Sequence, residues 1–476
     1  MTDIRYVCLS DTHFGEEDSL LTNLKTASTD TEPTEPSPVM QQLVACLKDL
    51  ISKNQNGTKP TLILNGDILE LALCTTNEAA MVLERFIELI MPKNEELFEK
   101  IVYIPGNHDH HLWEMARETQ YINHVSSLKN KSLPIPWHAT NMFADNLSDL
   151  VASFFLSGLL RRNRDHLKDI DVTIAYPNLG LIREDKEKCI IFTHGHFIEP
   201  LYHLMSTMRN LIFPDREKPR YIWDIEAENF AWIDFFWSTM GRSAGAGKDV
   251  EVIYEKMHDK EAFKKLLYTM AESLAKKYDL PGWGDIMEAK ILKLILSALV
   301  EKAFDLEKTK AEKPLSKEGE KGLWAYMNGP LKTQILLERK ENMPRDVTFV
   351  FGHTHKPFSE DMNFREYPEW VNVYNTGGWI VESVDPEPLH GSAVILVDDE
   401  LNAVSLRMHN ENQDSSKYAV RLEEATHEGE RNNPLFEHIS HSVNFTDDLW
   451  KEFSSAVARA IRVRAQNLRA RINEKE

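Results

Sequence analysis

Acidic, amide and imidazole side chains stand where apolar, strand-like runs of this sequence end. The first of these runs, 4–9, is followed by Asp11 and His13. Four later runs end in Asp67, in Asn107 and His108, in His194, and in His353 and His355. Where helices cover a sheet of this kind, sites form at the carboxyl ends of its strands. We therefore expect these side chains to meet in one site.

The donor atoms of these side chains favour a pair of divalent metal ions. They are oxygen and imidazole ligands without a thiolate, which suits two first-row ions better than a structural zinc site. A two-metal centre needs a bridging carboxylate and a few terminal ligands on each ion. Asp67 is the natural bridge. One site would be completed by Asp11, His13 and His355, and the other by Asn107, His194 and His353.

The elements that position these ligands are expected to be buried strands between helical layers. The runs are apolar throughout rather than alternating, and helix-like segments separate them, which indicates an α/β fold. Residues 39–53 and 78–99 have the apolar spacing of amphipathic helices. Gly66, Gly106 and Gly352 precede ligands and are expected to let the backbone turn sharply there.

Residues 197–346, between the fourth and fifth strand ends, have a different character. The stretch FAWIDFFW at 230–237 is dense in aromatic side chains, and 261–274 places apolar side chains on one helical face. The stretch ILKLILSALV at 291–300 should be a buried helix. We expect a helical insertion that stands over the strand ends. Its aromatic stretch is expected to pack on the core, with contact to a lipid or nucleoside substrate as the alternative.

The order Asp-x-His, Gly-Asp, Gly-Asn-His, His and Gly-His-x-His resembles the calcineurin-like metallophosphoesterase family. The ligand roles given above match the assignment in that family. The resemblance covers about 1–196 and 347–408, which would be the two parts of the core. It implies a β-sandwich of mixed sheets flanked by helices, here with a large helical insertion.

The resemblance also implies a reaction. Two divalent ions about 3.5–4 Å apart would lower the pKa of a shared water enough to give hydroxide near neutral pH. The hydroxide would attack phosphorus in line, and His108 resembles the family histidine that donates a proton to the leaving oxygen. Many members carry Gly-Asp-x-x-Asp, whose second Asp pairs with this histidine in the phosphoprotein phosphatases. This chain has Glu70 instead, which would make the same pairing with a longer arm or face away.

Metal identity is left open by the ligands, because ligand type only narrows the choice. Manganese is expected first, with iron, zinc, nickel or magnesium as alternatives.

The motifs NGDILEL, GNHDH, THGH, GHTHKP and NTGGW look closest to the branch that contains UDP-2,3-diacylglucosamine diphosphatases. Those enzymes also have a helical insertion between the fourth and fifth motifs. The insertion here is longer and shows no segment that matches theirs, so their substrate applies here only by analogy. The resemblance implies a metal-dependent phosphoesterase acting on a small phosphorylated substrate, nucleotide- or lipid-linked. A phosphodiester or pyrophosphate is preferred, with a phosphomonoester next and a nucleic acid third. A non-catalytic metal-binding scaffold is the other alternative, although scaffolds of this fold have typically lost ligands that this chain keeps.

Several other side chains are weaker candidates: His110, His111, His138, His196, His203, Lys356, Arg161, Arg162 and Arg164. Isolated histidines are usually core or surface residues, and arginine clusters are usually solvated. His196 is the strongest because it follows a ligand by two residues, and Lys356 follows the last ligand and would approach a phosphate.

The C-terminal region is expected to contain a polar linker, 409–446, and a basic amphipathic helix, 447–476. Apolar side chains of the helix form one stripe, with arginines around it: Leu449, Phe453, Val457, Ile461, Leu468 and Ile472, with Arg459, Arg462, Arg464, Arg469 and Arg471. Such a helix would pack on its own acidic body, join an oligomer or contact anionic lipid. In so acidic a chain, we expect packing on its own body.

Composition narrows the functional classes. The formal net charge of −20 argues against broad binding to nucleic acid, whose phosphates attract basic surfaces. No secretory signal pattern and no apolar stretch long enough to span a bilayer is recognised. Cys8, Cys46, Cys74 and Cys189 are scattered without CxxC spacing, which favours reduced thiols. We therefore expect a cytoplasmic protein.

Overall fold

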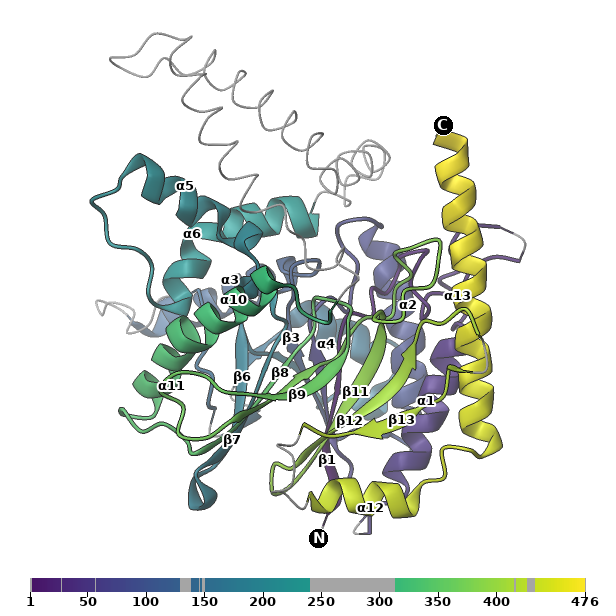
Figure 1. The fold of residues 1–476 in the computed structure, drawn as a ribbon. Helices are drawn as coiled ribbons and strands as arrows, with labels where there is room; N and C mark the ends of the chain where they lie inside the picture. The colour runs from purple at the N-terminus through teal and green to yellow at the C-terminus, as the bar shows by residue number, and fades with distance from the viewer. Residues whose placement is uncertain are drawn as a thin grey trace.

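The computed structural model describes residues 2–239 and 313–475, without 27, 56, 129–137, 145, 148–149, 415–416 and 426–432. In this part of the chain, two mixed sheets pack against each other and helices cover their outer faces (Figure 1). The predicted α/β fold of two mixed sheets flanked by helices is confirmed.

The first sheet has eight strands among the described residues, in the order β13-β12-β11-β1-β2-β3-β5-β4. Its strands are β1 (Ile4–Leu9), β2 (Thr61–Asn65), β3 (Lys100–Ile104), β4 (Val151–Ala152), β5 (Val172–Ile174), β11 (Gly391–Asp398), β12 (Ala403–Asn410) and β13 (Arg421–Glu423). The central strands β1, β2, β3 and β5 run parallel. Strand β11 pairs antiparallel with β1, and this pairing joins the C-terminal part of the core to the N-terminal strand.

The second sheet has five strands in the described ranges, in the order β6-β7-β8-β10-β9. They are β6 (Asn178–Arg183), β7 (Lys188–Thr193), β8 (Asp346–Phe351), β9 (Phe358–Met362) and β10 (Val371–Asn375). Strands β7 and β8 are parallel neighbours, although the whole insertion lies between them in sequence. Their carboxyl ends therefore leave the sheet side by side.

The central strands of the first sheet are buried on both faces, by the second sheet on one face and by helices on the other. Cys8, Ile63 and Val102 of the first sheet share a cluster with Phe192 and Val350 of the second. The alternate residues of the first sheet, such as Val7 and Leu62, belong to the cluster under the helices. Burial on both faces explains why the runs are apolar throughout. All four cysteines are free, and three of them are buried.

Helices on the core begin and end at recognisable signals. They are α1 (Pro38–Ile51), α2 (Thr76–Ile90), α3 (His111–Leu128) and α4 (Phe154–Arg161). Ser37 caps α1 by accepting from Met40 N, and Thr75 and Glu78 form a capping box at α2. Helix α2 ends well before the predicted residue 99, because Pro92 follows it and cannot continue a helix.

Helices joined by loops make up the described part of the insertion, up to the start of β8. The part of the insertion before residue 240 contains α5 (Leu204–Ile212), α6 (Ile222–Asp234) and the π-helical turn η6 (Phe235–Thr239). The part of the insertion after residue 312 contains α10 (Lys317–Tyr326), the π-helical turn η9 (Met327–Leu331) and α11 (Lys332–Glu338). The predicted helical stretches 261–274 and 291–300 lie outside the described residues.

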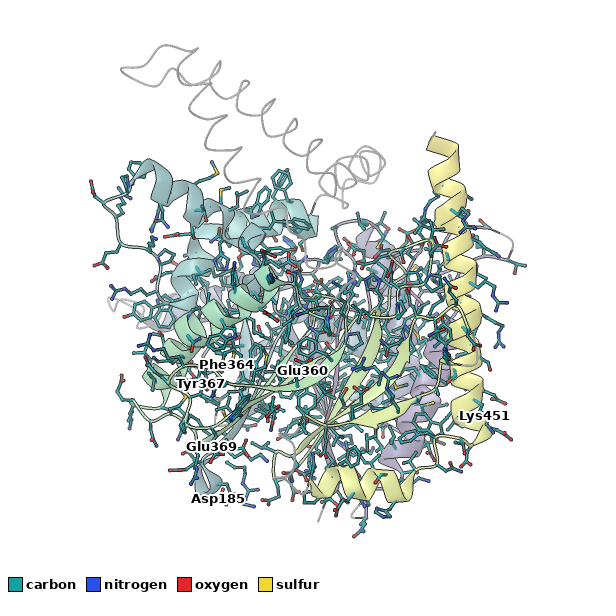
Figure 2. The ribbon with its side chains drawn as sticks, in the orientation of Figure 1. Asp185, Glu360, Phe364, Tyr367, Glu369 and Lys451 are labelled. Atoms are coloured by element: carbon teal, nitrogen blue, oxygen red, sulfur yellow. The ribbon has the colours of Figure 1, made fainter. Side chains whose placement is uncertain are left out.

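The second part of the insertion is anchored on the edge of the second sheet. Between β9 and β10, the Tyr367 hydroxyl donates to Met327 O at 2.9 Å. The Phe364 and Trp324 rings lie 5.3 Å apart between centroids. Figure 2 labels Phe364 and Tyr367 in this connection. Tyr326 of α10 also donates to Asn178 of β6, at 2.8 Å. The insertion therefore forms a layer over this sheet.

The C-terminal region packs on the body, as expected. Helix α13 (Asp448–Lys475) runs beside α1, and Figure 1 shows the two side by side. Trp450, Phe453, Val457 and Ile461 of α13 are buried. Within the segment expected to be a linker, β13 joins the first sheet and α12 (Pro434–Ser442) follows it. None of the described helices combines the length and apolar character needed to cross a membrane.

Candidate metal centre

All seven predicted ligands lie together, at the carboxyl ends of strands from both sheets. Strands β1, β2 and β3 lead to Asp11 and His13, to Asp67 and to Asn107. Strands β7 and β8 of the second sheet lead to His194 and to His353 and His355. The ligands are buried, with none more than 2% exposed. The expectation of one shared site at the strand ends therefore matches where these side chains lie.

The first group of ligands contains Asp11, His13 and His355. The Nε2 atoms of His13 and His355 lie 3.3 Å apart. Asp11 Oδ1 is 3.3 Å from His355 Nε2. One donor atom from each of the three residues lies within 4.8 Å of the others. This is the set expected to hold one of the two ions.

The second group contains Asp67, Asn107, His194 and His353. His194 Nε2 lies 3.0 Å from Asn107 Oδ1, 3.2 Å from His353 Nδ1 and 3.1 Å from Asp67 Oδ2. The same Asp67 oxygen is 4.0 Å from His13 Nε2 in the first group. Asp67 Oδ2 therefore faces both groups, as a bridging ligand must.

The contacts within the centre fit bound cations better than a network of hydrogen bonds. Imidazole nitrogens face each other at 3.2 and 3.3 Å, and carboxylate oxygens converge on the same points. Asp67 Oδ2 is buried and accepts no hydrogen bond within the described ranges. Buried acceptors left without donors are costly, and a divalent ion at each point would satisfy them. The residues present therefore suit two divalent ions.

Outer carboxylates fix the orientation of three of the histidines. Glu70 Oε2 lies 2.8 Å from His13 Nδ1, and Glu382 Oε1 lies 2.8 Å from His355 Nδ1. These contacts leave the Nε2 atoms of both rings directed to the first group. Glu199 Oε1 is 3.3 Å from His353 Nε2, which leaves Nδ1 for the second group. Such outer partners fix the ring and raise its basicity as a ligand.

Glu70 also pairs with the predicted catalytic histidine. Its Oε2 atom lies 2.7 Å from His108 Nδ1, so the longer arm does reach. Burial raises the pKa of the Glu70 carboxyl, but the neighbouring charge and hydrogen bonds of His108 and His13 lower that pKa to about 2. Glu70 is therefore ionised at neutral pH and holds His108 with Nε2 directed away from it.

Five of the seven ligands have a left-handed backbone. The φ angles are 49° at Asp11, 45° at His13, 50° at Asp67, 68° at His353 and 56° at His355. Each such residue is strained and persists only where its surroundings over-determine it. Backbone N–H groups supply part of this constraint. Asp11 N donates to Gly66 O at 2.9 Å, and His353 N donates to Asp11 Oδ1 at 2.9 Å.

The glycines before the ligands act in two ways. Gly66 has a φ of 83° and makes the predicted sharp turn. Gly106 and Gly352 do not have a positive φ, so their backbone angles do not themselves require glycine. A Cβ at Gly106 would overlap Asp67 Oδ1, and one at Gly352 would overlap Asp11 Oδ2. Glycine is needed at these two positions because a ligand carboxylate crosses the backbone there.

Asp109 is a structural residue of the site that the sequence reasoning missed. Its carboxylate accepts from Ile68 N at 2.8 Å, from Gly106 N at 2.6 Å and from the Tyr103 hydroxyl. These bonds tie the loop of Asp67 to the loop of Asn107. Burial and the charge of Asp67 raise the pKa of Asp109 to about 6. Its place inside the GNHDH motif was the available signal, whereas Glu199 and Glu382 belong to no quoted motif.

A second buried cluster joins the insertion to the loop of the catalytic histidine. His110 Nε2 lies 2.7 Å from Glu226 of α6, and the Tyr176 hydroxyl donates to Glu226 at 2.9 Å. His111 Nδ1 lies 3.0 Å from Asp234. Burial lowers the pKa of His110, but Glu226 and Asp234 raise it to about 10. His110 is therefore a cation paired with carboxylates of the insertion.

Aromatic side chains of the insertion reach the metal centre. The Trp237 ring centroid lies 6.4 Å from that of His108 and 5.3 Å from that of Tyr202. Tyr202 in turn lies 5.2 Å from His353. Trp232 packs inside the insertion and donates from Nε1 to Leu201 O at 3.1 Å. The stretch 230–237 thus serves both packing and the wall of the site.

The weaker candidates have mainly structural surroundings. His196 is buried 5.6 Å from the His194 ring, and burial together with His194 and His353 holds its pKa well below the usual value. His203 lies 2.7 Å from Phe197 O. Arg162 pairs with Glu84, and Arg164 donates to backbone carbonyls, so the arginines are not directed to the metal centre. Lys356 is fully buried.

Residues 4–233 match the model of the calcineurin-like phosphoesterase family. This part of the chain is therefore similar to a metallophosphoesterase domain. The buried His/Asp/Glu clusters, which also include His353 and His355 beyond it, are compatible with a metal-dependent phosphoesterase. The match includes the first four motifs and extends through most of α6. No curated protein matches the chain.

Proposed function

We propose that this protein is a dinuclear metal-dependent phosphoesterase that hydrolyses a phosphodiester or pyrophosphate bond in a small substrate. The observation that carries the proposal is the convergence of the two ligand groups on Asp67 Oδ2, which lies 3.1 Å from His194 and 4.0 Å from His13. Asp11, His13 and His355 would hold one ion, and Asn107, His194 and His353 the other, with Asp67 shared.

Two divalent ions held there would lower the pKa of a water and bind a phosphate oxygen. Manganese is the first choice, because the oxygen ligands suit it, and the imidazole ligands keep iron, zinc and nickel as alternatives beside magnesium.

The chain's own residues supply the proton and its positioning. His108 would donate a proton from Nε2 to the leaving oxygen, since its Nδ1 is engaged by Glu70 at 2.7 Å. Glu70 is ionised and would stabilise the charged imidazole that must donate. Its second contact, to His13, couples the acid to the first ligand group. The backbone N–H of His108 donates to Asp67 Oδ1 at 2.8 Å, which fixes the acid relative to the bridge.

The surroundings of His108 support an organic leaving group. Trp237 lies beside the ring of His108, where the departing alcohol or phosphate ester would be released. The motif resemblance to UDP-2,3-diacylglucosamine diphosphatases supports a diester or pyrophosphate over a monoester. A nucleotide- or lipid-linked substrate would supply both an organic group beside Trp237 and a diester or pyrophosphate bond.

The test is hydrolysis of bis-p-nitrophenyl phosphate and p-nitrophenyl phosphate after chelation and restoration of Mn²⁺. The wild type should hydrolyse the diester faster, and Asp67→Asn should lose both activity and metal. His108→Ala should keep its metal and lose about 10²- to 10⁴-fold in turnover, the usual share of a general acid. Faster hydrolysis of the monoester would assign a phosphomonoesterase. Two bound metals without any turnover would favour a non-catalytic scaffold.

A further inference from the structure

The C-terminal helix lies directly behind the first ligand loop, defined here as residues 10–22. Arg464 of α13 is only 5% exposed. Its Nε donates to Ser19 O at 2.8 Å, and its Nη2 donates to Thr22 O at 2.6 Å. Arg471, about two turns further along the helix, pairs with Glu17 and Asp18 of the same loop. The helix thus holds this loop with two arginines.

The two residues that Arg464 holds are themselves hydrogen-bonded to backbone groups that neighbour the predicted ligands. Ser19 Oγ donates to Thr12 O at 2.6 Å, and Thr12 stands between Asp11 and His13. Thr22 Oγ1 accepts from Gly15 N at 3.0 Å. Ser19 therefore connects Arg464 to the peptide group between Thr12 and His13.

The same helix supports the ligands from a second direction. Phe453 of α13 packs edge-on against Trp379, with centroids 6.4 Å apart. Trp379 N donates to Asp11 O at 2.9 Å, and Leu20 N donates to Trp379 O at 2.7 Å. Trp379 follows Gly378, where a Cβ would overlap the ring of His355. The helix therefore backs both strand-end loops that supply the first ligand group.

Such support matters at this position because the loop is strained. Asp11 and His13 both have left-handed φ angles, which their surroundings must maintain. A guanidinium suits the task, since its rigid fork binds two carbonyls at once and stays charged when buried. Burial lowers the pKa of Arg464 to about 10, so it remains a cation at neutral pH.

We infer that α13 is a working part of the metal centre and that Arg464 is a positioning residue for Asp11 and His13. The helix lies outside residues 4–233, the part of the chain that matches the family. The inference rests on the proposed function only in treating Asp11 and His13 as metal ligands.

The test uses the full chain with Arg464→Met, which keeps the length of the side chain and removes its donors. Arg462→Met is the matched control, because Arg462 is exposed on the same helix. Mn²⁺ binding is measured by titrating the metal-free protein and following free Mn²⁺ by electron paramagnetic resonance. Arg464→Met should weaken one of the two binding steps by about 10-fold or more, as loss of outer support does. The control should remain within about twofold of the wild type, a difference far below that loss.

Binding of Mn²⁺ does not require turnover, so the test is separate from failure of the proposed hydrolysis. If hydrolysis is present, the lost activity of Arg464→Met should return at high Mn²⁺ with an unchanged KM for substrate. If Arg464→Met does not fold, Ser19→Ala removes the bond to Thr12 and should weaken the same step. Unchanged Mn²⁺ binding in the folded variant would overturn the inference.

Discussion

Glu70 serves two histidines with one carboxylate oxygen. Its Oε2 lies 2.8 Å from Nδ1 of the ligand His13 and 2.7 Å from Nδ1 of His108. Its other oxygen accepts from Ala72 N and Leu73 N, at 2.8 and 2.9 Å. A glutamate at this position is thus fixed by the turn that follows it. In the proposed function, this one side chain would couple metal binding by His13 to proton donation by His108.

The coupling predicts a double defect in Glu70→Gln. The neutral amide no longer stabilises a charged His108 and offers His13 a weaker partner, so both turnover and metal affinity should fall, the latter by about 10- to 100-fold. Turnover at saturating Mn²⁺ and Mn²⁺ titration measure the two effects separately. His108→Ala is the comparison, because it should lose turnover and retain metal. A Glu70→Gln protein with unchanged Mn²⁺ affinity would show that His13 does not depend on it.

Acid should weaken the folded protein through the same group. The folded pKa of Glu70 is about 2, below the usual 4.5, so its contribution to stability is complete above pH 4.5 and disappears as the pH falls toward 2. Urea unfolding of the metal-free protein between pH 6 and 3.5 should show this loss. Glu70→Gln should have a shallower pH dependence over this range.

At the scale of elements, α6 of the insertion is fixed to the core by charge. His110 pairs with Glu226 at 2.7 Å, and His111 pairs with Asp234 at 3.0 Å. His111 N also donates to Ser238 Oγ of η6 at 2.9 Å. His110 and His111 follow His108 by two and three residues in sequence. The position of the insertion and that of the catalytic loop are therefore linked.

Alkaline pH should loosen this link. The pKa of His110 is raised from 6.5 to about 10, so its contribution to stability is complete below pH 6.5 and is lost as the pH rises through 10. Glu226→Gln breaks the buried pair and should destabilise the protein by about 3–5 kcal/mol at pH 6. Urea unfolding of both proteins at pH 6 and 9.5 measures the difference. The difference in the free energy of unfolding between the wild type and Glu226→Gln should be smaller at the higher pH. An equal difference at both pH values would contradict the pairing of His110 with Glu226.

The sequence predicted those parts of the centre that follow a regular rule. Each ligand comes after a buried strand, and parallel strands end at one edge, so Asp11 and His355 could be placed together although they are far apart in the chain. Glu199, Glu382 and Arg464 follow no such rule. They reach the site by tertiary contact, and their positions depend on how the insertion, the Trp379 loop and α13 pack. The end of α2 was not predicted, because apolar and charged residues alternate over the whole of 78–99 and this pattern obscures the stop signal of Pro92.

At the scale of the whole molecule, the centre depends on distant parts of the chain. The pairing of β11 with β1, and of β8 with β7, brings the second core segment back beside the first. His353 N then donates to Asp11 Oδ1 at 2.9 Å. Trp237 and Tyr202 cover the ligands from the insertion, and α13 backs them from behind. Both sheets, the insertion and α13 therefore all contribute to the candidate metal centre.

The burial of the seven ligands predicts slow loss of metal. A substrate needs to contact only one face of an ion, whereas a chelator must replace ligands that are at most 2% exposed, so complete removal of an ion requires the fold to open locally. The rate of Mn²⁺ release should therefore stop increasing once EDTA is in large excess, because opening sets the limit. Stopped-flow or timed sampling with a colorimetric indicator measures this rate. Glu226→Gln should raise the limiting rate, and a rate that stays proportional to EDTA would mean that the ligands are directly accessible.

Such burial means that the identity of the bound metal is decided while the protein folds. If ions exchange only through rare local opening, the metal in the site is the one that was present as the two sheets closed, and a different metal in a later buffer replaces it only slowly. Affinity order alone would favour copper or zinc over manganese at imidazole and carboxylate ligands. The metal found after purification would then report the growth medium, and two preparations of one sequence would differ in activity without differing in structure.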